Sequence, residues 1–369
     1  MKKIKILSTL LAFVLMLGAV AVSFSSCSGG DTVIMSISDG EITKEMKLST
    51  YKFLLSRMKG TLEYYDYDVD SDSFWRTIIS SDGKTWDDHF SSTIFEQTKL
   101  YLTIEYLFDK EGLTLDESRE EKIEKTMSGL VTASGSLTAL NSELKNYGVN
   151  YDMLRDIYVT EQKFSQLLAY YYGESGEKID KSVKDQFYKD NYVAFGQIFL
   201  PIYEVVTGSD GKEQASFFDD EKKEEMLDLA KKYSSECDGR LDRFYEYCEL
   251  YSELEDSDEP TYLFVQSEYY GLQDQSSAYL DTVAEELSSM AVGECKVIAS
   301  PFGYHVICRY AREDGAYENE KYKESFSDFF AMLSDKLFDE KCAFYAENIT
   351  VYEDVERPRI SSVKSNKLY

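Results

Sequence analysis

Apolar side chains recur every three or four residues through residues 44–190, which is the spacing of helices that bury one face. Before them, residues 33–43 read as a short strand, a turn at Asp39-Gly40 and a helix start near Thr43. The pattern therefore predicts a mainly helical first half. Its clearest apolar faces are Leu48, Tyr51, Leu54, Leu55 and Met58; Leu100, Ile104, Leu107 and Phe108; and Leu154, Ile157, Phe164, Leu167 and Leu168.

The pattern changes at residue 192, where β-branched and aromatic side chains replace the helical spacing. From here short apolar strands and charged helices follow in the order β-α-α-β-α-β-β, so the predicted fold class is α+β. A long helix at 319–347 comes next, and the segment after residue 350 is polar. The strands are expected at 192–200, 261–265, 296–299 and 304–309, and the helices at 219–234, 241–254 and about 280–290.

The first 27 residues have the layout of a secretory signal: three early lysines, an apolar run over 6–22, and small residues before Cys27. The segment ending at Cys27 resembles the lipobox of bacterial lipoproteins, which implies that Cys27 is acylated and becomes the mature N-terminus. Two acyl groups would anchor the chain to the extracytoplasmic face of a bacterial cell membrane. The alternatives are a permanent membrane helix over 6–22 and a structural or free Cys27.

The composition restricts the partners and the metal sites that the chain can have. The chain of 369 residues carries a net charge of −28, and loss of Lys2, Lys3 and Lys5 with the leader changes it to −31. Such a chain disfavours nucleic acid and favours basic or unfolded cationic partners, although solubility alone also explains the charge. Only two histidines are present, His89 and His305, so a three-histidine zinc site is excluded. We expect no metal and no cofactor.

Several segments together resemble the extracytoplasmic parvulin foldases, the PrsA- and SurA-like group. They are the lipobox, Asp39-Gly40-Glu-Ile-Thr43, the helix end Tyr188-Lys-Asp-Asn191, and Phe302-Gly-Tyr-His-Val-Ile307, which is similar to the closing hairpin of parvulin-type prolyl isomerases. The β-α-α-β-α-β-β order also suits a parvulin domain. The resemblance implies a helical SurA-N-like chaperone domain with an inserted parvulin-like domain.

The resemblance also implies how the chain is divided, with the C-terminal helix folding back onto the chaperone domain. The expected parts are a lipoprotein signal peptide at 1–26, a lipid-anchored tether at 27–32, the helical chaperone domain at 33–191, the parvulin-like domain at 192–312, the C-terminal helix at 313–350 and a polar tail at 351–369.

Parvulins place two neutral histidines and a Cys or Asp beneath an apolar proline pocket. His305 matches the second histidine, although a histidine between isoleucines is often only a core residue. Aligning Ile198-Phe199-Leu200 with the family's apolar triplet places Gln197 at the first histidine position, where it could hold His305 by a hydrogen bond but cannot titrate. The third position falls on Glu236 or Cys237, and the alignment leaves both open.

Substrate contacts follow from the same resemblance. Tyr279 and Val283 lie where the family helix offers apolar side chains to proline, and Phe302 opens the hairpin motif. The alternative for Tyr279 and Val283, which their helical spacing favours, is ordinary packing of a helix on a sheet.

A turn at 300–303 sets a hairpin register in which paired positions sum to 603. His305 then lies opposite Ile298, and Cys295 lies opposite Cys308. Cross-strand cysteines come close enough to form a disulfide. Two reduced, buried thiols are the alternative.

The expected function is that of a membrane-anchored foldase or chaperone for newly secreted, unfolded polypeptides, with peptidyl-prolyl cis-trans isomerase activity that is weak or lost. The alternative is a non-catalytic peptide-binding holdase that keeps only the parvulin shape. An unrelated enzyme with paired carboxylates is a third reading, but 68 acidic residues make such pairs unavoidable and uninformative.

Overall fold

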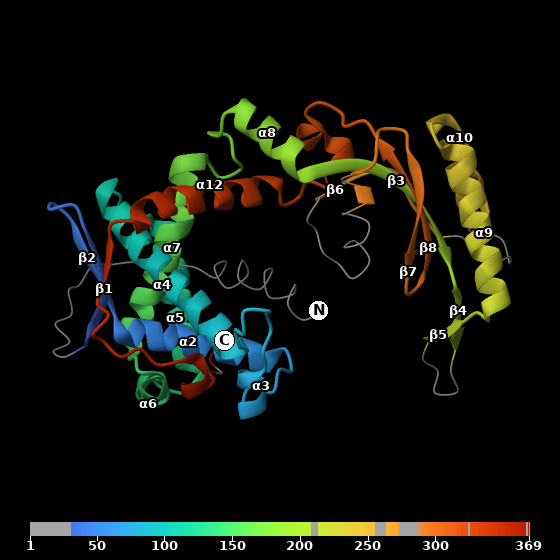
Figure 1. Ribbon diagram of the computed structural model, residues 1–369. Helices are drawn as coiled ribbons and strands as arrows, with labels where there is room; N and C mark the ends of the chain where they lie inside the picture. The colour runs from blue at the N-terminus through green and yellow to red at the C-terminus, as the bar shows by residue number, and fades with distance from the viewer. Residues whose placement is uncertain are drawn as a thin grey trace. The chain divides into compact units, whose positions relative to one another are not determined.

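The computed structural model describes residues 31–207, 213–254, 263–272, 286–287, 289–323, 325–366 and 368 (Figure 1). These residues form two compact units. Of the described residues, the helical unit contains 31–178 and those from Ser334 onward, and the sheet unit contains those within Ile179–Leu333. Both helices and strands are present, as the predicted α+β class requires. Among the described residues, none of the helices has the length and apolar character needed to cross a membrane.

The helical unit combines a bundle of helices with a small antiparallel sheet of order β2-β1-β9. Its strands are β1 (Val33–Ser38), β2 (Thr43–Lys47) and β9 (Ile349–Val351). Its helices are α2 (Leu48–Tyr64), α3 (Asp72–Arg76), α4 (Trp86–Lys110), α5 (Glu117–Ala133), α6 (Leu137–Leu144), the 3-10 turn η1 (Lys145–Tyr147), α7 (Tyr151–Tyr172), the C-terminal part of α12 (Phe329–Ala346) and the 3-10 turn η4 (Ile360–Ser362).

The predicted helix start at Thr43 is wrong, because Thr43–Lys47 forms β2 and the helix begins at Leu48. Residues 43–47 pair with β1 through a turn in which Gly40 adopts a positive φ of 93°. The ladder with β1 satisfies the backbone groups of this segment, and Met46 is buried. Tertiary pairing therefore outweighs the local helical pattern.

A buried ion pair joins three helices of the helical unit. Arg57 of α2 lies 2.7 Å from the Glu161 carboxylate of α7, and the Tyr101 hydroxyl of α4 donates to the same oxygen at 2.6 Å. Arg57 also donates to the Tyr101 hydroxyl at 2.9 Å. Glu161 is almost fully buried, and burial raises the pKa of its carboxyl. The other carboxylate oxygen, Oε2, has no hydrogen-bond partner among the described residues.

The C-terminal segment, expected to be a polar tail, lies against the helical unit. Ile360 and Asn366 are fully buried. The Lys59 ammonium group of α2 donates to the carbonyl oxygens of Ser361 and Val363, at 3.0 Å each. A few buried positions and backbone hydrogen bonds are therefore enough to hold a segment whose composition is mostly polar.

The sheet unit is built on a four-stranded antiparallel sheet of order β6-β3-β8-β7. A two-stranded ribbon, β4-β5, stands where the sequence pattern predicts only a polar loop near 207–213. The elements are α8 (Lys181–Asn191), β3 (Tyr192–Pro201), β4 (Tyr203–Thr207), β5 (Glu213–Phe217), α9 (Asp220–Cys237), α10 (Leu241–Leu254), β6 (Leu263–Leu272), β7 (Cys295–Ser300), β8 (Gly303–Tyr310) and the 3-10 turns η2 (Ala316–Glu318) and η3 (Glu320–Tyr322).

Aromatic rings close one end of the sheet unit. Tyr188 at the end of α8 and Tyr192 at the start of β3 both contact Phe326, with ring centroids 5.7 and 4.9 Å apart. Tyr317 of η2 stacks on Phe329, the first residue of α12, at 4.5 Å. The helix expected at 319–347 therefore begins later, because the residues before Phe329 form 3-10 turns around this aromatic cluster.

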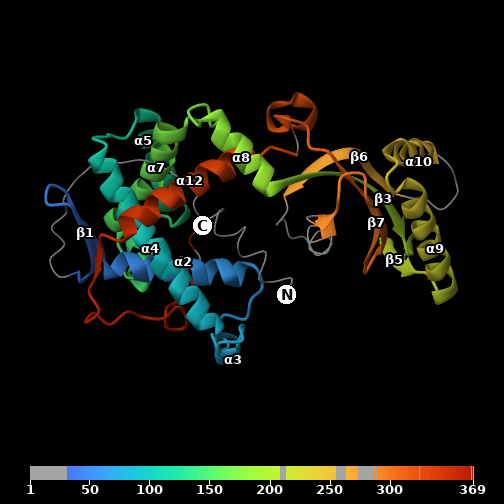
Figure 2. The ribbon, with the colours of Figure 1, turned by 45° about the horizontal axis from the view of Figure 1, so that its top comes forward.

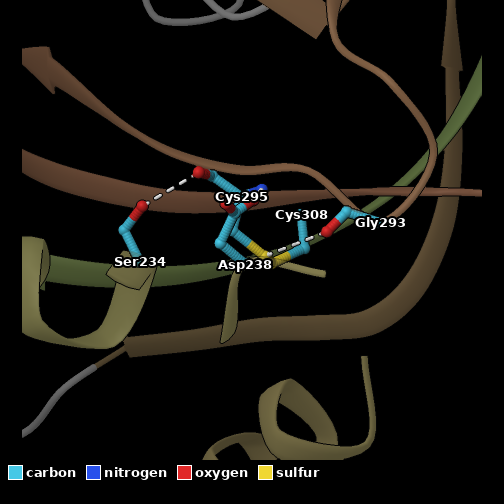
Figure 3. Close-up of a disulfide and its surroundings, with 5 residues drawn as sticks. All are labelled: Ser234, Asp238, Gly293, Cys295 and Cys308. Atoms are coloured by element: carbon cyan, nitrogen blue, oxygen red, sulfur yellow. Dashed lines mark hydrogen bonds between the residues drawn. A yellow bond between two sulfur atoms is a disulfide. The ribbon is translucent and has the colours of Figure 1, made fainter. Parts of the chain in front are cut away.

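The predicted hairpin register is confirmed: Cys295 pairs with Cys308, and Ile298 pairs with His305. Cys295 and Cys308 are joined by a disulfide bond (Figure 3). The C-terminal end of α9 also holds the backbone of Cys295, since Ser234 donates to its carbonyl oxygen at 3.0 Å and Asp238, the residue after α9, accepts from its N–H at 3.1 Å.

Removal of this bridge is expected to destabilise the sheet unit. The disulfide spans 13 residues, and a loop of this size contributes about 3 kcal/mol through the entropy of the unfolded chain. A Cys295→Ser, Cys308→Ser double variant should lose about that much free energy of unfolding in urea denaturation. In the unmodified chain from Ser28, thiol counting in denaturant should find three thiols before reduction and five after it. Five thiols before reduction would contradict the bridge.

Because the pair of Arg57 and Glu161 is buried, loss of the Glu161 carboxylate should cost much more free energy of unfolding than loss of an exposed carboxylate. Glu161→Ala leaves the buried Arg57 cation unpaired and should lower the free energy of unfolding by about 3–5 kcal/mol. Asp72→Ala breaks the exposed pair of Asp72 with Arg76 and should cost less than about 1 kcal/mol. Chemical denaturation of both variants makes the comparison, and equal losses would show that the buried pair has no special role.

Candidate functional site

The antiparallel pairing of β3 with β8 gathers the candidate site on one face of the sheet. Phe199 pairs directly with His305, and Gln197 pairs with Ile307. Direct partners in an antiparallel ladder share a face, and so do residues two apart along a strand. Gln197, Phe199, His305 and Ile307 therefore face the same way. The family resemblance links Gln197 with His305, and the structure places the two on adjacent strands.

His305 is a buried, neutral imidazole. Its side chain is only 4% exposed, and the Phe199 ring stacks on it with centroids 4.5 Å apart and planes 17° from parallel. Burial lowers the pKa of His305 to about 3, from an ordinary 6.5. At neutral pH the ring therefore carries no charge, and it can act only through hydrogen bonds and contact.

Ser300 orients the His305 ring. The Ser300 Oγ lies 2.9 Å from His305 Nε2, and it donates to the Gly303 carbonyl oxygen at 3.2 Å. The Ser300 oxygen also accepts from the Phe302 N–H at 3.2 Å. The turn between β7 and β8 thus holds the Nε2 edge of the His305 ring, and the imidazole tautomer decides which of the two groups donates.

Gln197 introduces an unpaired polar atom beside this ring. Its side chain is 1% exposed, and Oε1 is buried with no hydrogen-bond partner among the described residues. The expected bond between Gln197 and His305 is not present. The two positions are diagonal rather than opposite, and the Phe199 ring occupies the place directly opposite His305. A buried orphan carbonyl costs free energy unless a ligand or water satisfies it.

Cys237 lies away from His305, on the other side of the sheet. Tyr310 of β8 is an odd number of residues from His305, so it faces the opposite way, and its ring contacts Phe244 and Tyr245 of α10. Both views place α9 beside α10 on that side (Figures 1 and 2). Cys237 ends α9, is fully buried, and has its thiol pKa raised to about 12 by burial.

Glu236, the other residue considered for the third position, also belongs to the α9–α10 layer. Its carboxylate accepts a hydrogen bond from the Tyr247 hydroxyl of α10 and lies 3.6 Å from the Arg243 guanidinium. Tyr247 lowers the pKa of Glu236 through that bond. Neither residue considered for the third position therefore reaches the face that carries His305.

The part of this face around Ile298 and Ile307 is instead covered by apolar groups from the segment before β7. Leu287 and Met290 form a buried cluster with Phe195, Ile298 and Ile307. Tyr279 and Val283, the expected substrate contacts, lie outside the described residues, as does Cys27. Among the described residues no group of three or more metal-ligating side chains is found.

Phe302 and Phe199 are two accessible aromatic residues near this face. Phe302 is 45% exposed in the turn between β7 and β8, and its carbonyl oxygen accepts from the Ile202 N–H at 3.0 Å. Phe199 is half-buried. The next residue in the turn must be glycine, because a Cβ on Gly303 would meet the Leu200 carbonyl oxygen at 2.3 Å.

The sequence pattern does not single out Phe199 or Ser300, although both touch His305. Ser300 could have been found from the register sum of 603, which places it opposite Gly303 at the mouth of the hairpin. Phe199 could not, because its pairing with His305 joins strands that are about a hundred residues apart in the chain.

Solved foldases and chaperones are similar to the chain. Foldase protein PrsA from Streptococcus pneumoniae is 13% identical, with 75% of this chain and 95% of that chain covered and a TM-score of 0.26. PrsA from Bacillus subtilis is 16% identical, with 76% and 94% covered and a TM-score of 0.21. A SurA-like chaperone from Campylobacter jejuni is 6% identical, with 87% and 98% covered and a TM-score of 0.24. TM-scores this low support no closer comparison. No family model and no curated protein matches the sequence.

The lowered pKa of His305 predicts a pH-dependent loss of stability. Between about pH 6 and pH 4 the unfolded chain binds a proton at His305 that the folded sheet unit does not, so the free energy of unfolding falls as the pH falls. His305 should contribute about 1.4 kcal/mol of this loss per pH unit, and His305→Gln should remove it. Urea denaturation of both proteins across this range gives the difference, which should narrow as the pH falls. A constant difference would contradict the buried neutral ring.

Proposed function

We propose that the chain is an extracytoplasmic foldase that binds non-native secreted polypeptides and has a divergent prolyl isomerase site. One observation carries the proposal: the β3–β8 pairing puts Gln197, Phe199 and a neutral His305 on one face of a sheet of order β6-β3-β8-β7. The described order β3-α9-α10-β6-β7-β8, with the β4-β5 ribbon after the first strand, supports the proposal, and most of the helix expected at about 280–290 lies outside the described residues.

Such a site matches the needs of prolyl isomerisation. Rotation about an X-Pro bond crosses a barrier of about 20 kcal/mol, and no covalent step is required to lower it. The site must hold the proline ring on an apolar surface and favour the twisted amide over the planar one. Phe199 is the half-buried ring of the group, and it offers that surface. His305, held by Ser300 and stacked on Phe199, supports that ring without placing a charge beneath it.

Two features favour the alternative of a non-catalytic holdase. Gln197 stands where the resemblance expects a second imidazole, and Cys237 and Glu236 belong to the layer on the opposite side of the sheet. An isomerase site with one histidine and no nearby thiol or acid should be weak. Binding of an extended apolar segment on Phe199 needs none of the missing groups.

We also propose where the protein lies in the cell and which role each of its two units has. Acylation of Cys27 would tether the protein to the extracytoplasmic face of the bacterial cell membrane, with newly secreted polypeptides as clients.

The helical unit would be the chaperone module and the sheet unit the inserted parvulin-like domain. Support for this insertion comes from the chain, which leaves the helical unit after Lys178 and returns to it at Ser334. The net charge of −28 favours cationic clients.

A refolding assay tests the proposal directly. The chain from Ser28 to Tyr369 contains every described residue, and it should suppress aggregation of a reduced, unfolded protein while accelerating proline-limited refolding only slightly. Gln197→His restores a second imidazole next to Phe199 and should raise the isomerisation rate roughly tenfold, which is about 1.4 kcal/mol off the barrier. His305→Ala should remove the acceleration.

Gln214→His is the matched control, since Gln214 is exposed on β5 in the same unit. It should leave both activities unchanged. A refolding rate equal to that in buffer for the unmodified chain and for Gln197→His would remove the isomerase reading and leave the holdase. Failure to suppress aggregation as well would overturn the proposed function.

A further inference from the structure

The helical unit contains a groove between two helices that no other described side chain fills. The groove runs between α4 and α12 and encloses about 510 Å³. Its walls combine polar and charged side chains with small or apolar ones, among them Thr93, Leu100 and Thr103 of α4 and Ala343 and Ala346 of α12. Small side chains on two neighbouring helices leave room for a third segment to approach both backbones closely.

Gln97 of α4 lies in the wall of this groove and is incompletely satisfied. Its side chain is only 7% exposed, and its Nε2 is buried with no hydrogen-bond partner among the described residues. A buried amide group without a partner destabilises the fold, so its presence needs a reason. A peptide backbone supplies both a carbonyl acceptor and an N–H donor, and either can pair with an amide that turns about its last torsion angle.

The charges at the groove favour a cation. Glu96 is paired with Lys99 at 2.8 Å, so these two largely compensate each other. Asp339 of α12 also lines the groove, and no ion pair joins it to a described basic side chain. Partial burial raises the pKa of this carboxyl, and a Lys or Arg side chain beside it would compensate the buried negative charge. A second copy of this acidic chain would be repelled instead.

We propose that the groove between α4 and α12 binds a segment of a non-native polypeptide that combines small apolar side chains with a Lys or Arg. The apolar side chains occupy the space beside Leu100 and Ala343, the basic group pairs with Asp339, and the backbone satisfies the Gln97 amide. This inference rests on the proposed function and assigns the client-binding site and client chemistry to the helical unit, separate from the sheet face of His305.

Two labelled synthetic peptides of identical apolar sequence test the site, one carrying lysines and the other glutamates at the same positions. Fluorescence anisotropy with the chain from Ser28 should show binding of the lysine peptide and at least tenfold weaker binding of the glutamate peptide. Asp339→Asn should remove most of that preference. Ala343→Trp fills the groove from an exposed position and should weaken binding of the lysine peptide at least tenfold. Ala133→Trp, at an exposed alanine of α5 outside the groove, should leave it unchanged.

Gln97→Met separates a binding role from a structural one. Methionine has a similar volume and no polar atom to leave unpaired, so the variant should melt at a higher temperature while binding the lysine peptide more weakly. A lower melting temperature with unchanged binding would show that Gln97 is only a packing residue and would overturn the inference.

The remaining outcomes distinguish this inference from the proposed function. If Ala343→Trp binds the lysine peptide normally and the unmodified chain still suppresses aggregation, the groove is not the client site and the foldase proposal survives. If sedimentation shows a dimer that Ala343→Trp disrupts, the groove is an interface between copies and the inference fails. If the unmodified chain neither binds the peptides nor suppresses aggregation, both proposals fail.

Discussion

The pairing of β3 with β8 is the constraint on which the sheet unit depends. These are the two central strands of the sheet, and each residue of one fixes the face and partner of a residue of the other. A slip by one residue would turn His305 toward α9 and α10 and would carry Cys308 to the opposite face. Gly303 helps to set the register, because only a residue without a Cβ can pass so close to the Leu200 carbonyl oxygen.

In both units a buried polar atom without a hydrogen-bond partner among the described residues lies next to a proposed binding site. Gln197 lies beside the neutral His305, and Gln97 lies in the wall of the groove between α4 and α12. In each case an apolar residue of similar size would stabilise the fold more, so the polar group is retained at a cost. Glu161 is different, because its carboxylate balances the buried Arg57 and its loss would leave a charge unpaired. The first two are therefore the positions at which we propose binding, whereas Glu161 has a structural role.

Local sequence patterns predict most helices and the register of one hairpin, whereas the other contacts of the candidate site depend on residues far apart in the chain. The hairpin of β7 and β8 follows from a turn of four residues, so its register, the Cys295–Cys308 alignment and the position of His305 opposite Ile298 are all predictable. The partner of His305 across β3 is not, since nothing local relates residues 199 and 305. Thr43–Lys47 carries a weak helical signal but pairs with β1, and the polar C-terminal segment is held by Ile360 and by hydrogen bonds from Lys59. The side of the sheet taken by Cys237 depends on how two helices pack, which no spacing in the sequence reveals.

The central claim is that the sheet face of Phe199 and His305 receives proline-containing segments of unfolded chains. Hydrogen–deuterium exchange of the chain from Ser28, with and without an unstructured proline-containing peptide, tests it most directly. The account predicts slower exchange on peptide binding in β3, in β8 and in the turn at residues 300–303 that holds Ser300 and Phe302. Binding with unchanged exchange in all three segments would contradict it.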